Sequence, residues 1–197
     1  ELRRVKDETE LSHMRRAAEL TREGMKAAFE TIRPGLRERE VAAEIEYAMR
    51  RMGSEGTAFD TIVASGVRSA YPHGWCTDRK IERGDLVVLD IGAKYQNYRA
   101  DLTRTVTVGN PSSKQMRIHE VVREAQNRAF QSVRAGVKAC DIDAVARGLI
   151  EREGYGEYFV HSLGHGIGLD IHEPPRLNPE TKDCLLYTSD AADEEDS

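Results

Sequence analysis

Two aspartates in one short stretch are the first residues whose type and spacing could carry chemistry. Asp90 and Asp101 lie within residues 85–109, DLVVLDIGAKYQNYRADLTRTVTVG, where two runs rich in Val, Leu, Ile and Thr flank the polar segment KYQN. This pattern predicts a β-hairpin. With a turn centred between Tyr95 and Gln96, the two aspartates are directly opposite, with Cβ atoms about 5 Å apart. A divalent cation between them would turn their repulsion into attraction; a solvated edge hairpin with two incidental acids is the alternative.

Four histidines lie in predicted loops or glycine-rich stretches, whereas His13 and His119 are expected on helices, exposed to solvent. Glycines alternate around the second histidine of HSLGHGIG and permit close approach to a ligand; a glycine turn with an incidental imidazole is the alternative. The two histidines of this motif share strand parity but would be about 13 Å apart in an extended strand, so one metal ion cannot bind both. The better candidate ligand is the second. The four are His73, His161, His165 and His172.

The candidate ligands Asp90, Asp101 and His165 combine two carboxylates with one imidazole. Such a donor set suits Mn²⁺, Fe²⁺, Co²⁺ or Zn²⁺ better than a thiolate-preferring ion. Two metal ions about 3.5–4 Å apart would activate a bridging water and polarise a carbonyl group, which is the chemistry of hydrolysis. Two ions need more than three protein ligands, so further ligands must exist if the site is dinuclear.

Composition argues against several classes of partner. The formal net charge is −5, but the last eight residues, DAADEEDS, hold five acids and no base, and the remainder of the chain is balanced. We therefore expect neither a nucleic-acid nor a membrane partner. The three cysteines are widely spaced without a CxxC motif, which indicates reduced thiols and a cytoplasmic protein. No signal-peptide pattern and no apolar run long enough to span a bilayer is visible.

Helical periodicity predicts the elements that must position these residues. Apolar spacing predicts helices over about 9–31, 38–52 and 141–153, and a further long helix after Pro111 behind the Ser112-Ser113 cap. A strand is expected over 57–64, and residues 158–177 form a glycine-rich extended segment.

The two pairs of predicted helices have similar sequences, which indicates an internal repeat. A shift of 101 aligns AFETIRPGL (28–36) with AFQSVRAGV (129–137), and it also aligns Val41 with Ile142 and Gly53 with Gly154. This repeat predicts two related halves, each with helices followed by strands, that form one sheet backed by helices. A chance similarity between amphipathic helices is the alternative.

Several motifs together resemble one known family. VVLDIGA, RADLTRT, SAYPHG, SLGHGIG and DIHEPPRL are similar to motifs of the pita-bread metallopeptidases, which include methionine aminopeptidases, Xaa-Pro aminopeptidases and prolidases. The resemblance extends from Leu2 to about Asp183, and the opening ELRRVKDETELSHMRRAAEL is closer to the Xaa-Pro branch. It implies an α+β pita-bread fold, with two pseudo-symmetric helix-plus-strand halves around a curved antiparallel sheet.

The resemblance also implies roles for the candidate residues. Asp90, Asp101 and His165 match metal ligands, with Asp101 bridging two ions, of which Mn²⁺ is the first choice and Co²⁺, Zn²⁺ or Fe²⁺ are alternatives. His73 matches a histidine that contacts substrate or assists proton transfer. His161 and His172 match histidines that bind substrate and stabilise the tetrahedral intermediate. The implied substrate is a peptide or dipeptide with proline in second position, and the implied full-length protein is a cytoplasmic homodimer.

The chain departs from the family pattern after the HEPP segment. The family has two further glutamate ligands there, one of which is the usual candidate for general base, and this chain has no match to either motif. We therefore expect a C-terminally truncated catalytic domain at 1–183, followed by a disordered, out-of-family acidic tail at 184–197. Such a fragment can lack activity and stable folding. Two other functions stay open, namely methionine aminopeptidase and a non-hydrolytic pita-bread module that binds a peptide or protein partner.

Overall fold

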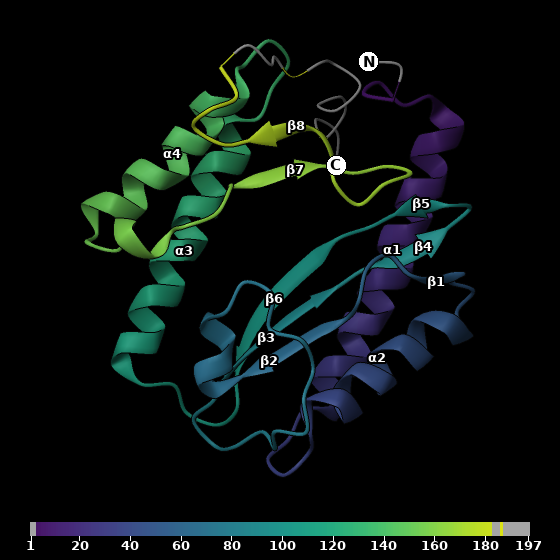
Figure 1. Ribbon diagram of the computed structural model, residues 1–197, viewed down its shortest axis with the longest axis vertical. Coiled ribbons are helices and arrows are strands. Elements are labelled where there is room, and N and C mark those ends of the chain that lie inside the picture. Colours follow the sequence, from purple (N-terminus) through teal and green to yellow (C-terminus); the bar gives the residue numbers. More distant parts are fainter. Residues whose placement is uncertain (1–2, 183–185, 187–197) are drawn as a thin grey trace. The chain divides into compact units, whose positions relative to one another are not determined.

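The computed structural model describes residues 3–182 and residue 186 of the 197-residue chain. The chain divides into two compact units (Figure 1). The hairpin unit comprises Glu8–Ser113 and Ile167–Ile171; the α3–α4 unit comprises Glu1–Asp7, Lys114–Gly166 and His172–Ser197. Among the described helices, none combines the length and apolarity that a membrane span requires.

In the hairpin unit, two helices pack against strands. Helix α1 (Glu8–Thr31) and helix α2 (Glu38–Arg51) match the predicted ranges. A three-stranded antiparallel sheet has the order β2-β3-β6, and a smaller sheet has the order β1-β4-β5. The 3₁₀ helix η1 (Gly66–Ala70) follows β2. The strands are β1 (Gly56–Thr57), β2 (Ile62–Ser65), β3 (Leu86–Ile91), β4 (Ala93–Tyr95), β5 (Tyr98–Arg99) and β6 (Leu102–Thr107).

In strand β3, the sequence LVVLDI places apolar residues on one face and the candidate ligand Asp90 on the other. Val87, Leu89 and Ile91 are fully buried in one core with residues of α1 and α2, whereas Val88 and Asp90 alternate onto the less buried face. Because successive side chains of a strand point to opposite faces, packing of the apolar set directs Asp90 away from that core.

The predicted pairing of the two aspartates is wrong by a small shift in register. Asp90 lies opposite Thr103 in the β3–β6 pair. The turn is centred between Gln96 and Asn97, both with positive φ (47° and 65°), one position later than expected. A two-residue hairpin turn of this kind needs positive φ at both central residues, which asparagine tolerates better than tyrosine. Asp101 is therefore two residues before the partner of Asp90.

The expected strand over 57–64 is two strands instead, β1 and β2. Residues 58–61 connect the two sheets, and the Ala58 amide donates to the Gly92 carbonyl at 2.8 Å. Gly92 lies at the matching break between β3 and β4, where an added Cβ atom would be 2.1 Å from the Ala100 carbonyl oxygen. Glycine is therefore required at position 92 by the close approach of another backbone.

One predicted exposure is also wrong. His13 is half-buried, not solvated, with its ring centroid 6.0 Å from that of Tyr95 and 5.6 Å from that of Tyr98. Its Nδ1 atom is buried without a hydrogen-bond partner in the described part of the chain. His119, by contrast, is exposed as expected.

The α3–α4 unit has its own core. Helix α3 (Ser113–Ser132) and helix α4 (Ala139–Arg152) bury one apolar face each, and the 3₁₀ helix η2 (Gly156–Tyr158) follows α4. The predicted glycine-rich segment contains two short antiparallel strands, β7 (Gly164–Gly166) and β8 (Glu173–Leu177). The buried side chains are Val121, Ala125, Ala129, Ile142, Ala146, Leu149, Ile150 and Leu186.

The predicted repeat is confirmed in the local structure of the helix pairs. Helices α2 and α4 each have 14 residues, and both ends differ by 101 positions. In the hairpin unit, the Gly35 amide donates to the Ile81 carbonyl and the Ile81 amide to the Leu36 carbonyl, both at 2.8 Å. In the α3–α4 unit, Leu186 makes the same two bonds with Gly136 and Val137, both at 3.0 Å. Leu186 is the one described residue of the segment 184–197; the predicted disorder of the rest lies outside the described residues.

Candidate functional site

Asp90 and Asp101 share one face of the hairpin. The Thr103 hydroxyl donates to Asp90 Oδ1 at 2.8 Å, so the side chains of this directly opposed pair lie on the same face. Asp101 precedes Thr103 by two positions, just before β6 begins, so the alternation of side chains places it on the same side as Thr103. Asp90 is half-buried and Asp101 is exposed. The hairpin therefore offers two carboxylates from one face, although not as a direct pair.

His73 lies exposed in the loop between β2 and β3, and a buried glutamate holds that loop. Glu38, in the first turn of α2, has no exposed surface. Its Oε1 accepts hydrogen bonds from the amide and hydroxyl of Ser65, both at 2.8 Å, and its Oε2 accepts them from the amide and hydroxyl of Thr77, at 2.9 and 2.6 Å. Arg68 Nε donates to the same Oε2 at 3.3 Å. Glu38 thus attaches both ends of the His73 loop to one helix.

The electrostatics of Glu38 follow from these contacts. Burial by itself raises the pKa of the Glu38 carboxyl, but the hydrogen bonds from Thr77 and Ser65 outweigh burial, and the pKa is lowered overall. Glu38 is therefore a charged carboxylate at neutral pH, held by donors on both sides. Sequence reasoning missed it, because an acid in the first turn of a helix is common on favourable dipole grounds alone.

Cys76 follows His73 in the same loop and is not an activated nucleophile. Its Sγ donates to the Thr61 carbonyl at 3.0 Å and accepts from the Val63 amide at 3.2 Å. Burial raises the pKa of the Cys76 thiol, which favours the neutral, less reactive form. The group attaches the loop to β2 and does not offer a thiolate.

His165 and His172 form an imidazole pair in the α3–α4 unit. Their ring centroids are 4.3 Å apart with an interplanar angle of 62°. The pair forms because β7 and β8 are antiparallel, with His165 opposite Arg176 and a register shift between His165 and Gly166. A Cβ atom at Gly166 would lie 2.6 Å from the Pro174 carbonyl oxygen, so a glycine is needed beside the candidate ligand. The sequence did not predict that these two histidines meet.

His161, the third histidine of this unit, is exposed. Its ring packs edge-on against Phe159 with centroids 5.0 Å apart, and its Nδ1 lies 2.7 Å from the Ser162 carbonyl oxygen. The carbonyl of His161 accepts from Arg147.

A buried acid follows His172 directly. Glu173 is 5% exposed and forms ion pairs with Arg3 and Lys6 of the N-terminal segment. Lys6 Nζ lies 3.4 Å from Glu173 Oε2. The N-terminal segment is thereby attached to β8. Sequence reasoning missed this contact, since nothing local relates two residues so far apart in the chain.

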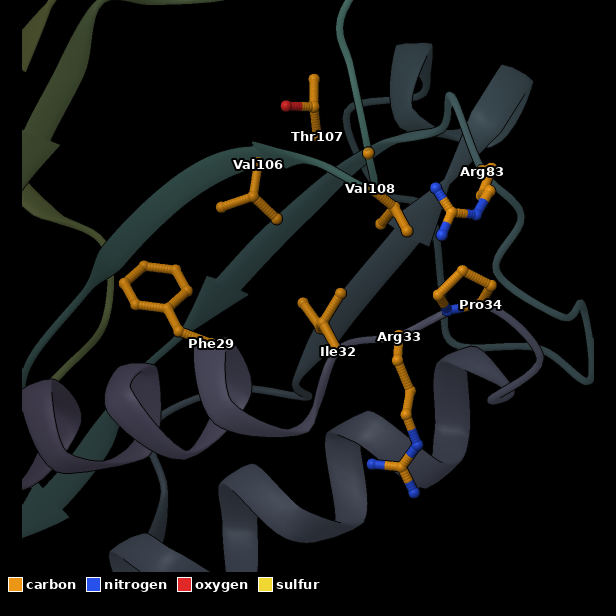
Figure 2. A pocket seen from close by; sticks show the side chains of 9 residues that line it. Phe29, Ile32, Arg33, Pro34, Arg83, Val106, Thr107 and Val108 are labelled. Carbon is orange, nitrogen blue, oxygen red and sulfur yellow. The ribbon is translucent and has the colours of Figure 1, made fainter.

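A hollow in the hairpin unit contains none of the candidate residues (Figure 2). It has a volume of about 450 Å³ beside the end of α1. Figure 2 shows its apolar side chains together with Arg33 and Arg83, whose guanidinium groups do not converge on one point. The hollow lacks the convergent polar groups that a small-molecule site needs.

The donor types fit a divalent metal ion, but the number of ligands gathered in the described residues does not. Asp90 and Asp101 belong to the hairpin unit, and His165 belongs to the α3–α4 unit. Within the described part of the chain, no group of three or more His, Cys, Asp or Glu side chains is close enough to hold a metal ion. The carboxylates and imidazoles suit an ion of intermediate hardness.

Residues 12–190 match the profile of Metallopeptidase family M24. The chain belongs to this family. It is 52% identical over 178 residues to the Xaa-Pro dipeptidase of Pyrococcus horikoshii, covering 90% of this chain and 51% of that relative. The family resemblance predicted from the motifs is thus confirmed.

Solved structures of the M24 relatives share the fold. The prolidase from Pyrococcus furiosus superposes with a TM-score of 0.92 at 50% identity, covering 94% of this chain and 55% of that one. The X-Pro aminopeptidase from Thermotoga maritima gives a TM-score of 0.91 at 49% identity, covering 94% and 53%. The α+β pita-bread fold is therefore confirmed, and the chain spans about half the length of these relatives.

Proposed function

We propose that this M24 chain acts in a metal-dependent peptidase that hydrolyses the bond between an N-terminal residue and a following proline. The observation that carries the proposal is its 52% identity to an Xaa-Pro dipeptidase over 90% of the chain. The retained carboxylates and histidines support it, because a module that only binds peptides has no need of them.

Asp90, Asp101 and His165 are the proposed ligands of two divalent metal ions, with Mn²⁺ as the first choice and Co²⁺, Zn²⁺ or Fe²⁺ as alternatives. When bound, such ions polarise a carbonyl group and lower the pKa of water. The two aspartates supply negative charge from one face of the hairpin. The Thr103 hydroxyl orients Asp90 by its hydrogen bond to Oδ1.

His73 is the proposed proton donor or substrate contact. Cleavage before proline releases a secondary amine, which must gain a proton as it leaves. An imidazole suits this step, because its unperturbed pKa is near neutrality. The exposed His73 ring lies on a loop that Glu38 holds at both ends. The loop therefore does not depend on His73 for its stability, and the imidazole can face substrate.

His161 and His172 are the proposed substrate-binding histidines that stabilise negative charge on the attacked carbonyl oxygen. His172 packs against the ring of His165. Contact between the two rings restricts both, so the proposed ligand and the proposed charge-stabilising group are oriented together.

The test uses the protein encoded by the complete gene, freed of metal with a chelator. With Mn²⁺ or Co²⁺ restored, we expect release of the first residue from Ala-Pro and Ala-Pro-Ala and little release from Met-Ala. Turnover of Met-Ala alone would assign the chain to methionine aminopeptidases. Peptide binding without turnover with Mn²⁺, Co²⁺, Zn²⁺ or Fe²⁺ would replace the proposal by the binding-module function.

Substitution of a proposed ligand gives the matched comparison. We expect Asp90→Asn and Asp101→Asn each to reduce kcat/KM by at least about 100-fold, because each removes a charge that the metal ions need. Asp78→Asn is the control, since Asp78 is exposed and forms surface ion pairs with Arg37 and Arg39. Equal activity of all three variants would contradict the ligand assignment.

A homodimeric state and a cytoplasmic location are also proposed. Sedimentation of the complete gene product tests the first, and cell fractionation tests the second.

A further inference from the structure

Arg147 on α4 makes an unusually complete set of contacts. Its Nε donates to Asp143 Oδ2 at 2.7 Å and its Nη2 to Asp143 Oδ1 at 2.9 Å. Its Nη1 donates to the Phe159 carbonyl at 2.8 Å, and its Nη2 also donates to the His161 carbonyl at 3.0 Å. The guanidinium carbon lies 4.2 Å from the centroid of the Phe159 ring, which is a cation–π contact.

Asp143 extends the same network to a third backbone group. Its side chain is 1% exposed, and its Oδ1 accepts from the Leu163 amide at 3.2 Å. The ion pair thus contacts the main chain at residues 159, 161 and 163, on both sides of His161 and at His161 itself. It also contacts the aromatic ring against which the His161 imidazole packs.

Burial distinguishes this ion pair from the Arg128–Glu124 pair of α3, since the Arg147 and Asp143 side chains are 20% and 1% exposed. Arg128 and Glu124 on α3 have the same i, i+4 spacing and the same 2.7 Å contact, but their side chains are 52% and 49% exposed. Such a surface pair contributes little to stability. Desolvation of a buried pair is costly, and hydrophobic residues of similar volume often replace it without loss of stability, so a buried pair is better explained by the conformation it specifies.

We propose that Arg147, held by Asp143, is a positioning residue that fixes the segment 159–163 and so presents the His161 imidazole in one orientation. The proposal rests on the proposed function in one respect, namely that His161 contacts substrate. Arg147 acts through His161 and through Phe159, and it does not contact substrate itself.

Kinetics of variants in the complete gene product test the proposal. We expect Arg147→Met to lower kcat/KM about 10- to 100-fold, since a misplacement of about 1 Å can cost that much. Arg147→Lys should have a kcat/KM between those of Arg147→Met and wild type. Lysine keeps the positive charge, but it lacks the planar guanidinium group that reaches two carbonyls. Arg128→Met should stay within about twofold of wild type.

A double substitution decides whether the effect passes through His161. If Arg147 acts by positioning His161, the variant Arg147→Met/His161→Ala should be no less active than His161→Ala alone. If the double variant instead loses kcat/KM by the product of the two single-variant losses, the two residues act independently and the proposal is wrong. This outcome would leave the proposed peptidase function intact.

Two measurements independent of turnover separate failure of this proposal from failure of the proposed function. Arg147→Met should increase amide hydrogen exchange at residues 159–163 and broaden or shift the His161 imidazole resonances, whereas Arg128→Met should change neither. If wild type proves inactive towards Xaa-Pro peptides, these measurements still test the positioning role. Unchanged exchange and resonances in Arg147→Met would overturn it.

Phe159→Leu covers the case in which Arg147→Met fails to fold. Leucine keeps an apolar side chain packed against the core but removes the flat ring that both Arg147 and His161 contact. We expect this variant to shift the His161 resonances and lower kcat/KM in the same direction. Wild-type resonances in a folded Phe159→Leu protein would contradict the proposal.

Discussion

At the scale of single residues, a buried glutamate and a largely buried ion pair anchor the segments that carry His73 and His161. Glu38 holds the ends of the His73 loop, and the Asp143–Arg147 pair holds the segment around His161. Both come from the second helix of their unit, α2 or α4. An exposed histidine on a loop has few contacts of its own, so its orientation depends on groups such as these.

Because the pKa of Glu38 is lowered in the native state, its contribution to the free energy of unfolding should depend on pH. Glu38→Gln should lower the free energy of unfolding by about 2–3 kcal/mol at pH 7, because the charged acceptor of several buried donors is lost. Since the native pKa is below the unfolded value of about 4.3, the unfolded state binds more protons there, and the stabilisation is lost as pH falls. The difference between wild type and Glu38→Gln should therefore be constant above about pH 6 and shrink below about pH 4.3.

Denaturant unfolding at several pH values measures this difference. Glu44→Gln is the matched control, since Glu44 is exposed on the same helix and should change stability by no more than about 0.5 kcal/mol. A difference for Glu38→Gln that grows at low pH would contradict the assignment of Glu38 as a charged native carboxylate.

At the scale of elements, the hairpin shows what periodicity can and cannot predict. The two Val-, Leu-, Ile- and Thr-rich runs predicted a hairpin, and strand β3 forms in the first of them with alternating burial that leaves Asp90 outside the core. Register was missed because it depends on which residues accept positive φ in the turn, and the turn is centred between Gln96 and Asn97. Asp101 is consequently two residues before Thr103, the partner of Asp90.

Two glycines in different elements should respond to alanine with opposite signs. Gly92→Ala should destabilise by about 2–3 kcal/mol, because its Cβ would meet the Ala100 carbonyl, a backbone atom that cannot move aside. Gly148→Ala, within α4, should stabilise by about 0.5–1 kcal/mol, since its Cβ would make an ordinary contact at 3.5 Å with Arg152. Thermal unfolding of both variants checks this, and a neutral Gly92→Ala would show that the two strand breaks are not closely packed.

At the scale of the whole molecule, the proposed metal ligands come from both compact units, Asp90 and Asp101 from one and His165 from the other. Each unit has a separate buried cluster of apolar side chains. The boundary predicted at 183/184 remains a prediction, with Leu186 the one described residue beyond it.

Metal binding to the 197-residue chain should be weak or limited to one site. The physical reason is that the described residues gather no group of three potential ligands, and two ions require more than three. Calorimetry with Mn²⁺ measures the stoichiometry, and an Asp90→Asn/Asp101→Asn variant should lose the remaining heat of binding. Tight binding of two ions would show that the ligand set is incomplete.

What the sequence by itself determined are features with a local signature. Periodicity, glycine placement and residue type were enough to predict the helix pairs and their offset of 101, the strand β3, the loop position of His73 and the family motifs. Tertiary structure alone decided the contact between His165 and His172, the displacement of Asp101 from the partner of Asp90, and the attachment of loops by Glu38 and Arg147. These features depend on contacts between residues 7 to 39 positions apart. No local pattern specifies such contacts, because packing and burial select them only once the helices and strands have met.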